Sequence, residues 1–185
     1  MDVFEISVAE GYEWVQGVDR PAREVLSALD GSARRSNWNA VDVRLVTAID
    51  EVPCLPADFP WLGSHALVLK RRTIDAVGSF LERFGELLPL NCVNCGAERL
   101  VVFNAVQILD ALDEARSEIV RFPTGRVMTV TRYSFRPDVV NDAVIFRIPQ
   151  LSKLFATESL TEHVHEHGLS GLKFEPVWRA TGVGS

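Results

Sequence analysis

The sequence has no long apolar run and no excess of basic residues. None of its hydrophobic stretches approaches the roughly 20 residues that span a bilayer, and the N-terminus begins Met1-Asp2-Val3, without the basic and apolar regions of a signal peptide. The formal net charge of its 185 residues is −6. Because nucleic acids and anionic membranes attract basic surfaces, this charge argues against both as direct partners. We therefore expect a cytoplasmic protein.

Cysteine is also scarce. Three cysteines, an odd number in a chain without an export signal, do not indicate a disulfide framework. Cys92 and Cys95 form a C-x-x-C motif, but a structural zinc site needs four ligands and the chain has no second such motif. A redox C-x-x-C would open a helix, whereas a strand pattern follows Cys95. We interpret the motif as a loop with two incidental cysteines, and keep a zinc-binding or redox role as the less favoured alternative.

The familiar catalytic motifs are missing as well. There is no G-x-S-x-G elbow, no glycine-rich phosphate loop and no Walker sequence. His163 and His167 are four residues apart and could chelate a metal on a helix, but Val164 stands where the metalloprotease motif has glutamate. We favour a solvated helix face, and a hydrogen-bonded structural role for His65. The sequence thus predicts neither enzymatic activity nor a cofactor; a small metal-dependent enzyme that uses the Cys92/Cys95 or His163/His167 pair is the alternative.

What is present predicts a single α+β domain over residues 1–185, with mixed, mostly antiparallel sheet, seven to nine strands and three or four helices. Asp19 is expected to cap a helix that turns Val25, Leu26 and Leu29 inward. Alternating or apolar runs predict the strands, and the proline-rich segment 53–61 predicts an ordered connector pinned by Phe59 and Trp61. The expected strands are 3–9, 41–49, 67–69, 99–104, 119–122, 127–135 and 144–148, and in the strand 127–135 the residues Val127, Thr129, Thr131, Tyr133 and Phe135 are expected on one face.

The last quarter of the chain, Lys153–Trp178, reads as a strand, a helix and a second strand. Thr157, or Ser159 in a capping box with Glu162, is expected to cap the helix, whose Leu160 and Val164 share a face before Gly168 ends it. Residues 65–90 repeat this order faintly, which suggests a strand–helix–strand unit at 65–90 duplicated at 153–178. Lys70, Arg71 and Arg72 begin the first helix against its macrodipole, which favours a solvated loop over recruitment by carboxylates or a partner.

An ordered series of segments resembles a family of bacterial polymorphic-toxin immunity proteins, the eleventh class of that group and formerly a domain of unknown function. The resemblance runs from about Tyr12 to Trp178. Its segments are Tyr12–Trp14, Leu29–Gly31 before Trp38, Gly63–Leu69, Gly85–Leu90, Phe103–Asn104, Leu112–Glu114 with Ser117, Tyr133–Arg136, Ile145–Pro149 and Gly168–Trp178. The resemblance implies an antitoxin that is encoded beside a toxin in a system of interbacterial competition. It would bind and silence that toxin by protein–protein contact, without chemistry of its own.

The charge pattern is compatible with this implied role, since an acidic inhibitor suits a toxin with a basic cleft. Residues 1–19 hold five carboxylates and no lysine or arginine. We expect the interface among carboxylates that have few cationic neighbours, with Trp14 or Trp38 as exposed aromatic anchors. The candidate toxin-binding residues are Glu10, Glu13, Trp14, Asp110, Asp113, Glu114 and Glu118.

Overall fold

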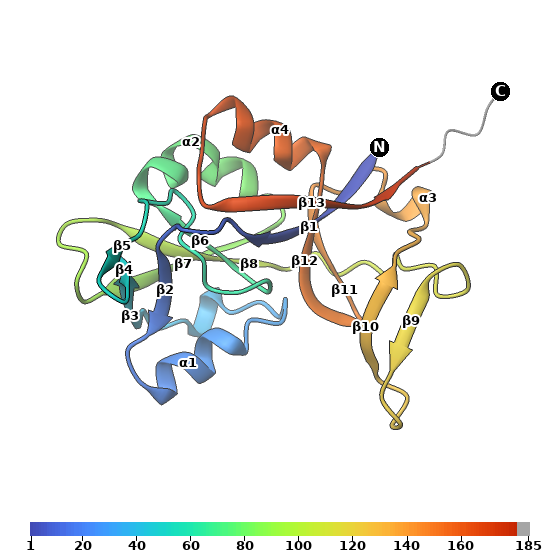
Figure 1. The fold of residues 1–185 in the computed structure, drawn as a ribbon, viewed down its shortest axis with the longest axis horizontal. Coiled ribbons are helices and arrows are strands. Elements are labelled where there is room, and N and C mark those ends of the chain that lie inside the picture. The colour runs from blue at the N-terminus through green and yellow to red at the C-terminus, as the bar shows by residue number, and fades with distance from the viewer. Residues whose placement is uncertain (181–185) are drawn as a thin grey trace.

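The computed structural model describes residues 1–180, which fold into two main sheets, two small hairpins and four α-helices (Figure 1). The predicted α+β class is confirmed. Within the described residues, no helix has the length and apolar character needed to cross a membrane. The strands are β1 (Asp2–Val8), β2 (Trp14–Gly17), β3 (Val41–Val46), β4 (Ala48–Ile49), β5 (Val52–Pro53), β6 (Leu67–Lys70), β7 (Gly85–Cys92), β8 (Leu100–Ala105), β9 (Glu118–Arg121), β10 (Val127–Arg132), β11 (Ile145–Ile148), β12 (Leu151–Thr157) and β13 (Leu172–Arg179); the helices are α1 (Arg20–Ser27), α2 (Arg71–Leu81), α3 (Pro137–Val140) and α4 (Glu158–Glu166).

The larger sheet has the strand order β2-β3-β7-β8-β6, and only the β3–β7 pair is parallel. Strand β8 is buried along its whole length because side chains pack on both faces of this sheet. Val68, Leu88 and Val102 face helix α1, which contributes Leu26, while residues of the alternate register, such as Phe103, face α2 and the second sheet. The continuous apolar run that predicted a buried strand here is thus explained by burial on two sides.

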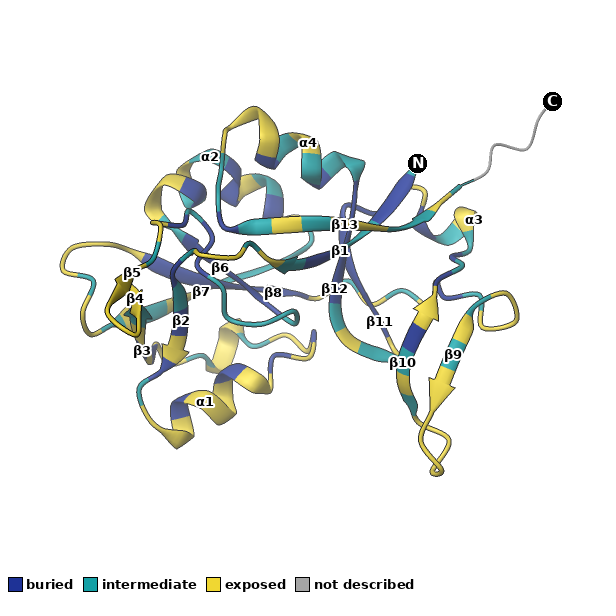
Figure 2. Ribbon diagram, viewed as in Figure 1, coloured by how far each residue is buried: buried dark blue, intermediate teal, exposed yellow. Residues whose placement is uncertain are grey.

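The second sheet, β11-β12-β1-β13, is antiparallel throughout. One face shares a core with α2, α4 and the larger sheet, through residues such as Ile6 and Leu154. The other face packs against the β9–β10 hairpin and α3. There the rings of Phe135 and Phe155 meet edge to face, with their centroids 5.5 Å apart. The molecule is therefore layered, and the two hairpins β4–β5 and β9–β10 lie at opposite ends and carry exposed residues (Figure 2).

Two strand–helix–strand segments share one topology. In β6-α2-β7 the antiparallel strand β8 lies between the two outer strands, and in β12-α4-β13 the strand β1 takes that place. The helices α2 and α4 are in contact, because the rings of Phe80 and His163 stack with their centroids 3.9 Å apart. The two segments coincide with the proposed duplicated unit at 65–90 and 153–178, and their common origin stays a prediction.

Several local expectations are wrong. No side chain caps α4: Thr157 occupies the N-cap position, but its hydroxyl donates to the carbonyl of Ala143 at 2.7 Å, and no Ser159–Glu162 capping box forms. Asp19 does cap α1, accepting from the Ala22 amide at 2.8 Å, yet Val25 is exposed instead of turned inward. A tertiary contact overrides the local preference at Thr157, because its hydroxyl finds a buried acceptor on the chain before β11.

The structure differs from the strand predictions in the number of strands and in the face predicted for residues 127–135. The described residues form thirteen strands, more than the seven to nine expected, because short pairs such as β4–β5 carry little pattern. In the β9–β10 hairpin the register shifts twice. As a result Val130 is buried and Thr131 exposed, so the single face predicted for Val127 to Phe135 is wrong at these two positions. Tyr133 and Phe135, beyond the end of β10, are buried as that face predicted.

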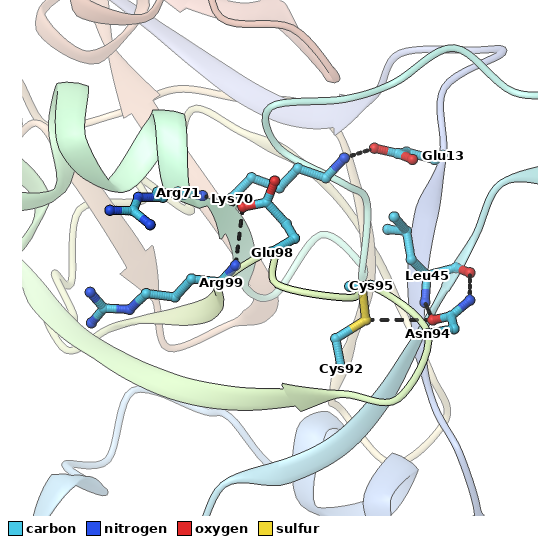
Figure 3. The surroundings of a disulfide bond; sticks show 9 residues. All are labelled: Glu13, Leu45, Lys70, Arg71, Cys92, Asn94, Cys95, Glu98 and Arg99. Carbon is cyan, nitrogen blue, oxygen red and sulfur yellow. Dashed lines mark hydrogen bonds and ion pairs between the residues drawn. A yellow bond between two sulfur atoms is a disulfide. The ribbon is translucent and has the colours of Figure 1, made fainter.

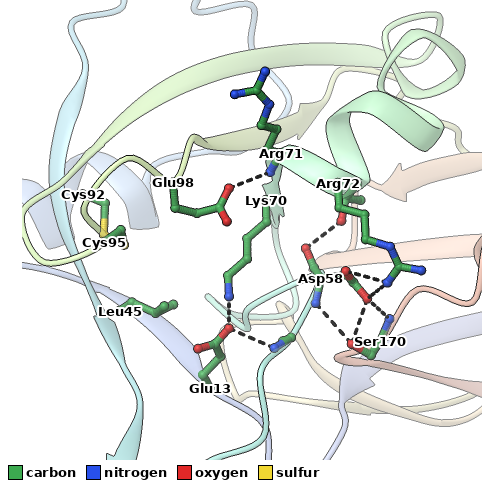
Figure 4. A network of polar contacts seen from close by, with 12 residues as sticks. Glu13, Leu45, Asp58, Lys70, Arg71, Arg72, Cys92, Cys95, Glu98 and Ser170 are labelled. Atoms are coloured by element: carbon green, nitrogen blue, oxygen red, sulfur yellow. Dashed lines mark hydrogen bonds and ion pairs between the residues drawn. A yellow bond between two sulfur atoms is a disulfide. The ribbon is translucent and has the colours of Figure 1, made fainter.

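The connector 54–66 is tied across the molecule by a network of polar contacts around Asp58 (Figure 4). The Asp58 carboxylate accepts from Arg72 Nη1 at 2.9 and 3.0 Å and from the amide and hydroxyl of Ser170, each at 2.9 Å. Lys70 pairs with the buried Glu13. The favoured interpretation of Lys70 to Arg72 as a solvated cluster is therefore wrong, because carboxylates from other elements neutralise two of its three charges.

Replacing Asp58 with alanine is expected to lower the free energy of unfolding by about 2 kcal/mol, because it leaves the half-buried Ser170 amide and hydroxyl without their acceptor. Asp75→Ala is the matched control, since Asp75 pairs with Arg71 at 3.9 Å and both side chains are more than 70% exposed. That control should change stability by less than about 0.5 kcal/mol. Equal losses for the two variants in urea denaturation would contradict the role assigned to Asp58.

Candidate functional site

The C-x-x-C motif forms a cross-linked turn. Cys92 and Cys95 are joined in a disulfide with their Cα atoms 5.5 Å apart (Figure 3), so the interpretation as incidental cysteines is wrong. Between them, Asn94 accepts from the Leu45 amide at 2.9 Å and donates to the Leu45 carbonyl at 2.8 Å. The turn thus continues the pairing of β7 with β3 through a side chain. Two sulfurs bonded to each other are not thiolate ligands, and no group of three metal-binding side chains gathers within residues 1–180.

The side chains of His65, His163 and His167 contact other groups within the folded chain. His163 places Nδ1 2.8 Å from the carbonyl of Ser159 and stacks on Phe80, so it is half-buried between α2 and α4 and the expected solvated face is wrong for this residue. His167 places Nδ1 2.8 Å from the carbonyl of His163. His65 is confirmed as a hydrogen-bonded residue, with Nε2 3.0 Å from the Leu26 carbonyl, and burial lowers its pKa. None of these arrangements presents a free chelating pair.

The N-terminal candidates for toxin binding separate in the structure. Glu13 was expected at the surface but is only 5% exposed, and it accepts from Lys70 and from the Ala57 amide. Trp14 is half-buried, in a bridge to Trp61 at the edge of the larger sheet. Trp38 is also half-buried and donates from Nε1 to the Pro89 carbonyl at 2.8 Å, so neither tryptophan is the exposed anchor that was expected. Glu10 alone of the N-terminal candidates is fully at the surface.

The second group of candidate carboxylates lies in and around the turn before β9, and each member has an arginine partner. The expectation that these residues have few cationic neighbours is therefore wrong. Their charges are already compensated within the chain, which weakens the field they offer to a partner. The pairs are Asp110 with Arg136 at 2.7 Å, Asp113 with Arg116 at 3.5 Å, Glu114 with Arg121 at 2.5 Å and Glu118 with Arg132 at 3.0 Å.

The β4–β5 hairpin has an unusual turn. Ile49 pairs with Val52, and the two residues between them have positive φ, +46° for Asp50 and +67° for Glu51. A two-residue hairpin turn of this hand normally uses Asn-Gly or Gly-Gly, because a Cβ is disfavoured in the left-handed region by about 1–2 kcal/mol per residue. Residues in sparsely populated backbone regions gather at functional sites. The turn thus holds two carboxylates at its tip in a conformation that glycine would adopt more easily.

The hairpin exposes apolar side chains beside these carboxylates. Ile49 is 49% exposed, Val52 67% and Leu55 56%. The base is fixed to the chain before β2, because the Leu55 amide donates to the Gly11 carbonyl at 2.8 Å and the Leu55 carbonyl accepts from the Glu13 amide at 3.0 Å. We call this the tip surface; its residues are Glu10, Ile49, Asp50, Glu51, Val52 and Leu55.

The turn carboxylates of the tip surface, Asp50 and Glu51, are uncompensated. The charge of Glu10, by contrast, acts on Lys173, where it adds to the hydrogen bond with Glu175 in raising the pKa of that ammonium group. Glu10, Asp50 and Glu51 take part in no ion pair with any of residues 1–180. Exposed apolar and acidic groups on an anchored surface hairpin can contact a partner that is basic and concave. Sequence reasoning missed this hairpin because Asp-Glu is no turn signal; the short run Ala48-Ile49 and Val52-Pro53 around two polar residues was the only hint.

Residues 97–179 match the model of the immunity protein family Imm11. The family expected from the sequence is confirmed over this segment, which contains β8 to β13 and therefore most of the second sheet. No curated protein matches the chain. The tip surface lies before the matched segment.

The strain in the turn gives a stability test. Glu51→Gly is expected to raise the free energy of unfolding by about 0.5–1 kcal/mol, since glycine tolerates φ of +67° and its extra entropy in the unfolded chain offsets part of the gain. Glu51→Gln removes the same charge and keeps the Cβ, so it should leave stability unchanged. Thermal or urea unfolding of the two variants measures the difference, and a gain shared by both would show that charge, not backbone conformation, is the cause.

Proposed function

We propose that the protein is an antitoxin that neutralises a toxin by direct contact, with the tip surface as the part that enters the toxin's basic cleft. The observation that carries the proposal is the anchored β4–β5 hairpin, which presents unpaired carboxylates and exposed aliphatic side chains together. The match to an immunity protein family supports the antitoxin role. In this role the protein performs no reaction and acts where the delivered toxin acts, in the cytoplasm.

Electrostatics favours the tip surface over the carboxylates near β9. A charge without a partner keeps its full long-range field, whereas Asp110, Asp113, Glu114 and Glu118 each share theirs with an arginine. Binding through the second group would also break those pairs. The net charge of −6 adds a weaker attraction to any basic partner.

The apolar residues of the tip surface would slow dissociation of the complex, which the charges do little to affect. Exposed charges at an interface mainly set the rate of association, and buried apolar contacts slow dissociation. Val52, the most exposed of the large aliphatic side chains, and Ile49 lie next to the turn on adjacent strands. A toxin cleft that accepts the hairpin would therefore hold these two side chains beneath a basic rim.

The alternative, a small metal-dependent enzyme, loses its support at the residues that suggested it. Cys92 and Cys95 are bonded to each other. His163 and His167 direct their Nδ1 atoms to backbone carbonyls of their own helix. No observation on the described residues favours this second function.

The experiment is co-purification with the toxin domain encoded by the adjacent gene, followed by association kinetics at low and high salt. Asp50→Asn/Glu51→Gln should slow association about tenfold at low salt and much less at high salt, because it removes steering charges without changing the turn conformation. Asp113→Asn/Glu114→Gln is the control with the same change in charge at the other end of the molecule.

The control should alter the association rate by less than about twofold. An unchanged rate for the Asp50/Glu51 variant with a slowed control would move the interface to the carboxylates near β9. Failure of the wild-type protein to bind or protect cells from the neighbouring toxin would overturn the antitoxin role itself.

A further inference from the structure

A cleft of about 580 Å³ opens at the end of the molecule opposite the tip surface. Its walls are the β9–β10 hairpin, the turn that joins β11 to β12 and the loop after α1, which places Asp30 at the rim. Three arginines line it: Arg121, Arg126 and Arg147. In a chain with net charge −6 this concentration of positive charge is unexpected.

Arg147 is the decisive residue because it is nearly buried and makes no direct ion pair with any of residues 1–180, although the charge of Asp30 at the rim partly opposes the fall in its pKa that burial causes. It lies on β11 and is 2% exposed. Its Nε donates to the Ala105 carbonyl at 2.9 Å and its Nη2 to the His65 carbonyl, while Nη1 has no acceptor among residues 1–180. Burial lowers the pKa of Arg147 to about 10, so its guanidinium stays charged at neutral pH. A buried charge that no carboxylate contacts directly is costly to fold around.

The other residues of the cleft add positive charge and a hydrogen-bond acceptor that has no donor. Arg126 is exposed and makes no ion pair with the described residues, and Arg121 is compensated by Glu114 at 2.5 Å. Asp30 is the one carboxylate in the lining, and it also faces Arg34 at 3.5 Å. Gln150 donates to Glu114 at 3.0 Å, but its Oε1 is buried and has no donor in the described part of the chain. The lining therefore has positive charge to spare and an acceptor that lacks a donor.

We propose that this cleft binds a small phosphorylated molecule, with its phosphate between Arg126 and Arg147 and a hydroxyl or amino group donating to Gln150 Oε1. Guanidinium groups bind phosphate oxygens through charge-assisted hydrogen bonds. The volume lies in the range of small-molecule sites and fits a ligand the size of a nucleoside monophosphate. The ligand supplies two contacts that the described residues do not: an anion in direct contact with Arg147 and a donor for Gln150 Oε1.

The test measures binding of inorganic phosphate and of adenosine monophosphate to the full chain by calorimetry and thermal unfolding, with ionic strength held constant by chloride. Both probes should bind, and both should raise the melting temperature. The monophosphate should bind more tightly because it also carries hydroxyl and amino donors. Arg126→Gln should weaken binding of each about tenfold, the effect of one lost hydrogen bond between charged groups.

Arg99→Gln is the matched control, because Arg99 is exposed, makes no ion pair with residues 1–180 and lies outside the cleft. It should bind both probes as the wild type does. Arg126 is at the surface, so its substitution should leave the fold intact, whereas substitution of Arg147 risks unfolding. A melting-temperature rise that chloride reproduces, or wild-type binding by Arg126→Gln, would overturn the proposal. Since no residue is shared with the tip surface, this result is independent of toxin neutralisation.

Discussion

The carboxylate of Asp58 is the contact on which the arrangement of the two sheets depends. It joins three segments: the connector that carries it, Arg72 in the first turn of α2, and Ser170 in the loop before β13. Phe59, the next residue, is fully buried in the core that the two sheets share. The connector is therefore held by polar contacts at the rim and by an aromatic ring inside, which explains how a proline-rich segment can be ordered without regular structure.

The same region shows how a helix can begin on three basic residues. No acidic residue lies in the first turn of α2, and Lys70 offers no side-chain cap. Glu98 accepts from the Arg71 amide at 3.1 Å, and Asp58 and Glu13 pair with Arg72 and Lys70 (Figures 3 and 4). Carboxylates from distant parts of the chain thus take the place of a local cap and offset the repulsion between the cations and the helix dipole.

The distribution of charge on the surface differs from that along the sequence, because many carboxylates pair with basic residues from distant parts of the chain. The acidic N-terminal stretch is largely neutralised in the fold, where Asp2 pairs with Arg179, Glu5 with Lys153 and Glu13 with Lys70. The hydrogen bond from Arg179 lowers the pKa of Asp2. Asp50 and Glu51 on the β4–β5 hairpin stay unpaired within the described residues, and Arg121, Arg126 and Arg147 gather in the cleft at the other end. The segment that matches the immunity family contains most of that cleft, whereas the tip surface lies outside it.

The sequence by itself determined the elements whose signal is local: the buried strand over β8, the Asp19 cap of α1, the apolar face of α4 with Leu160 and Val164, the ordered connector and the α+β class. Those features follow from residue periodicity and capping chemistry, which act over a few positions. Tertiary structure alone decided which charges remain unpaired, because a partner such as Arg179 for Asp2 stands 177 residues away. It also decided that Cys92 and Cys95 meet as a disulfide and that Asp50 and Glu51 turn a hairpin, since pairing of the flanking strands imposes the backbone conformation at both places.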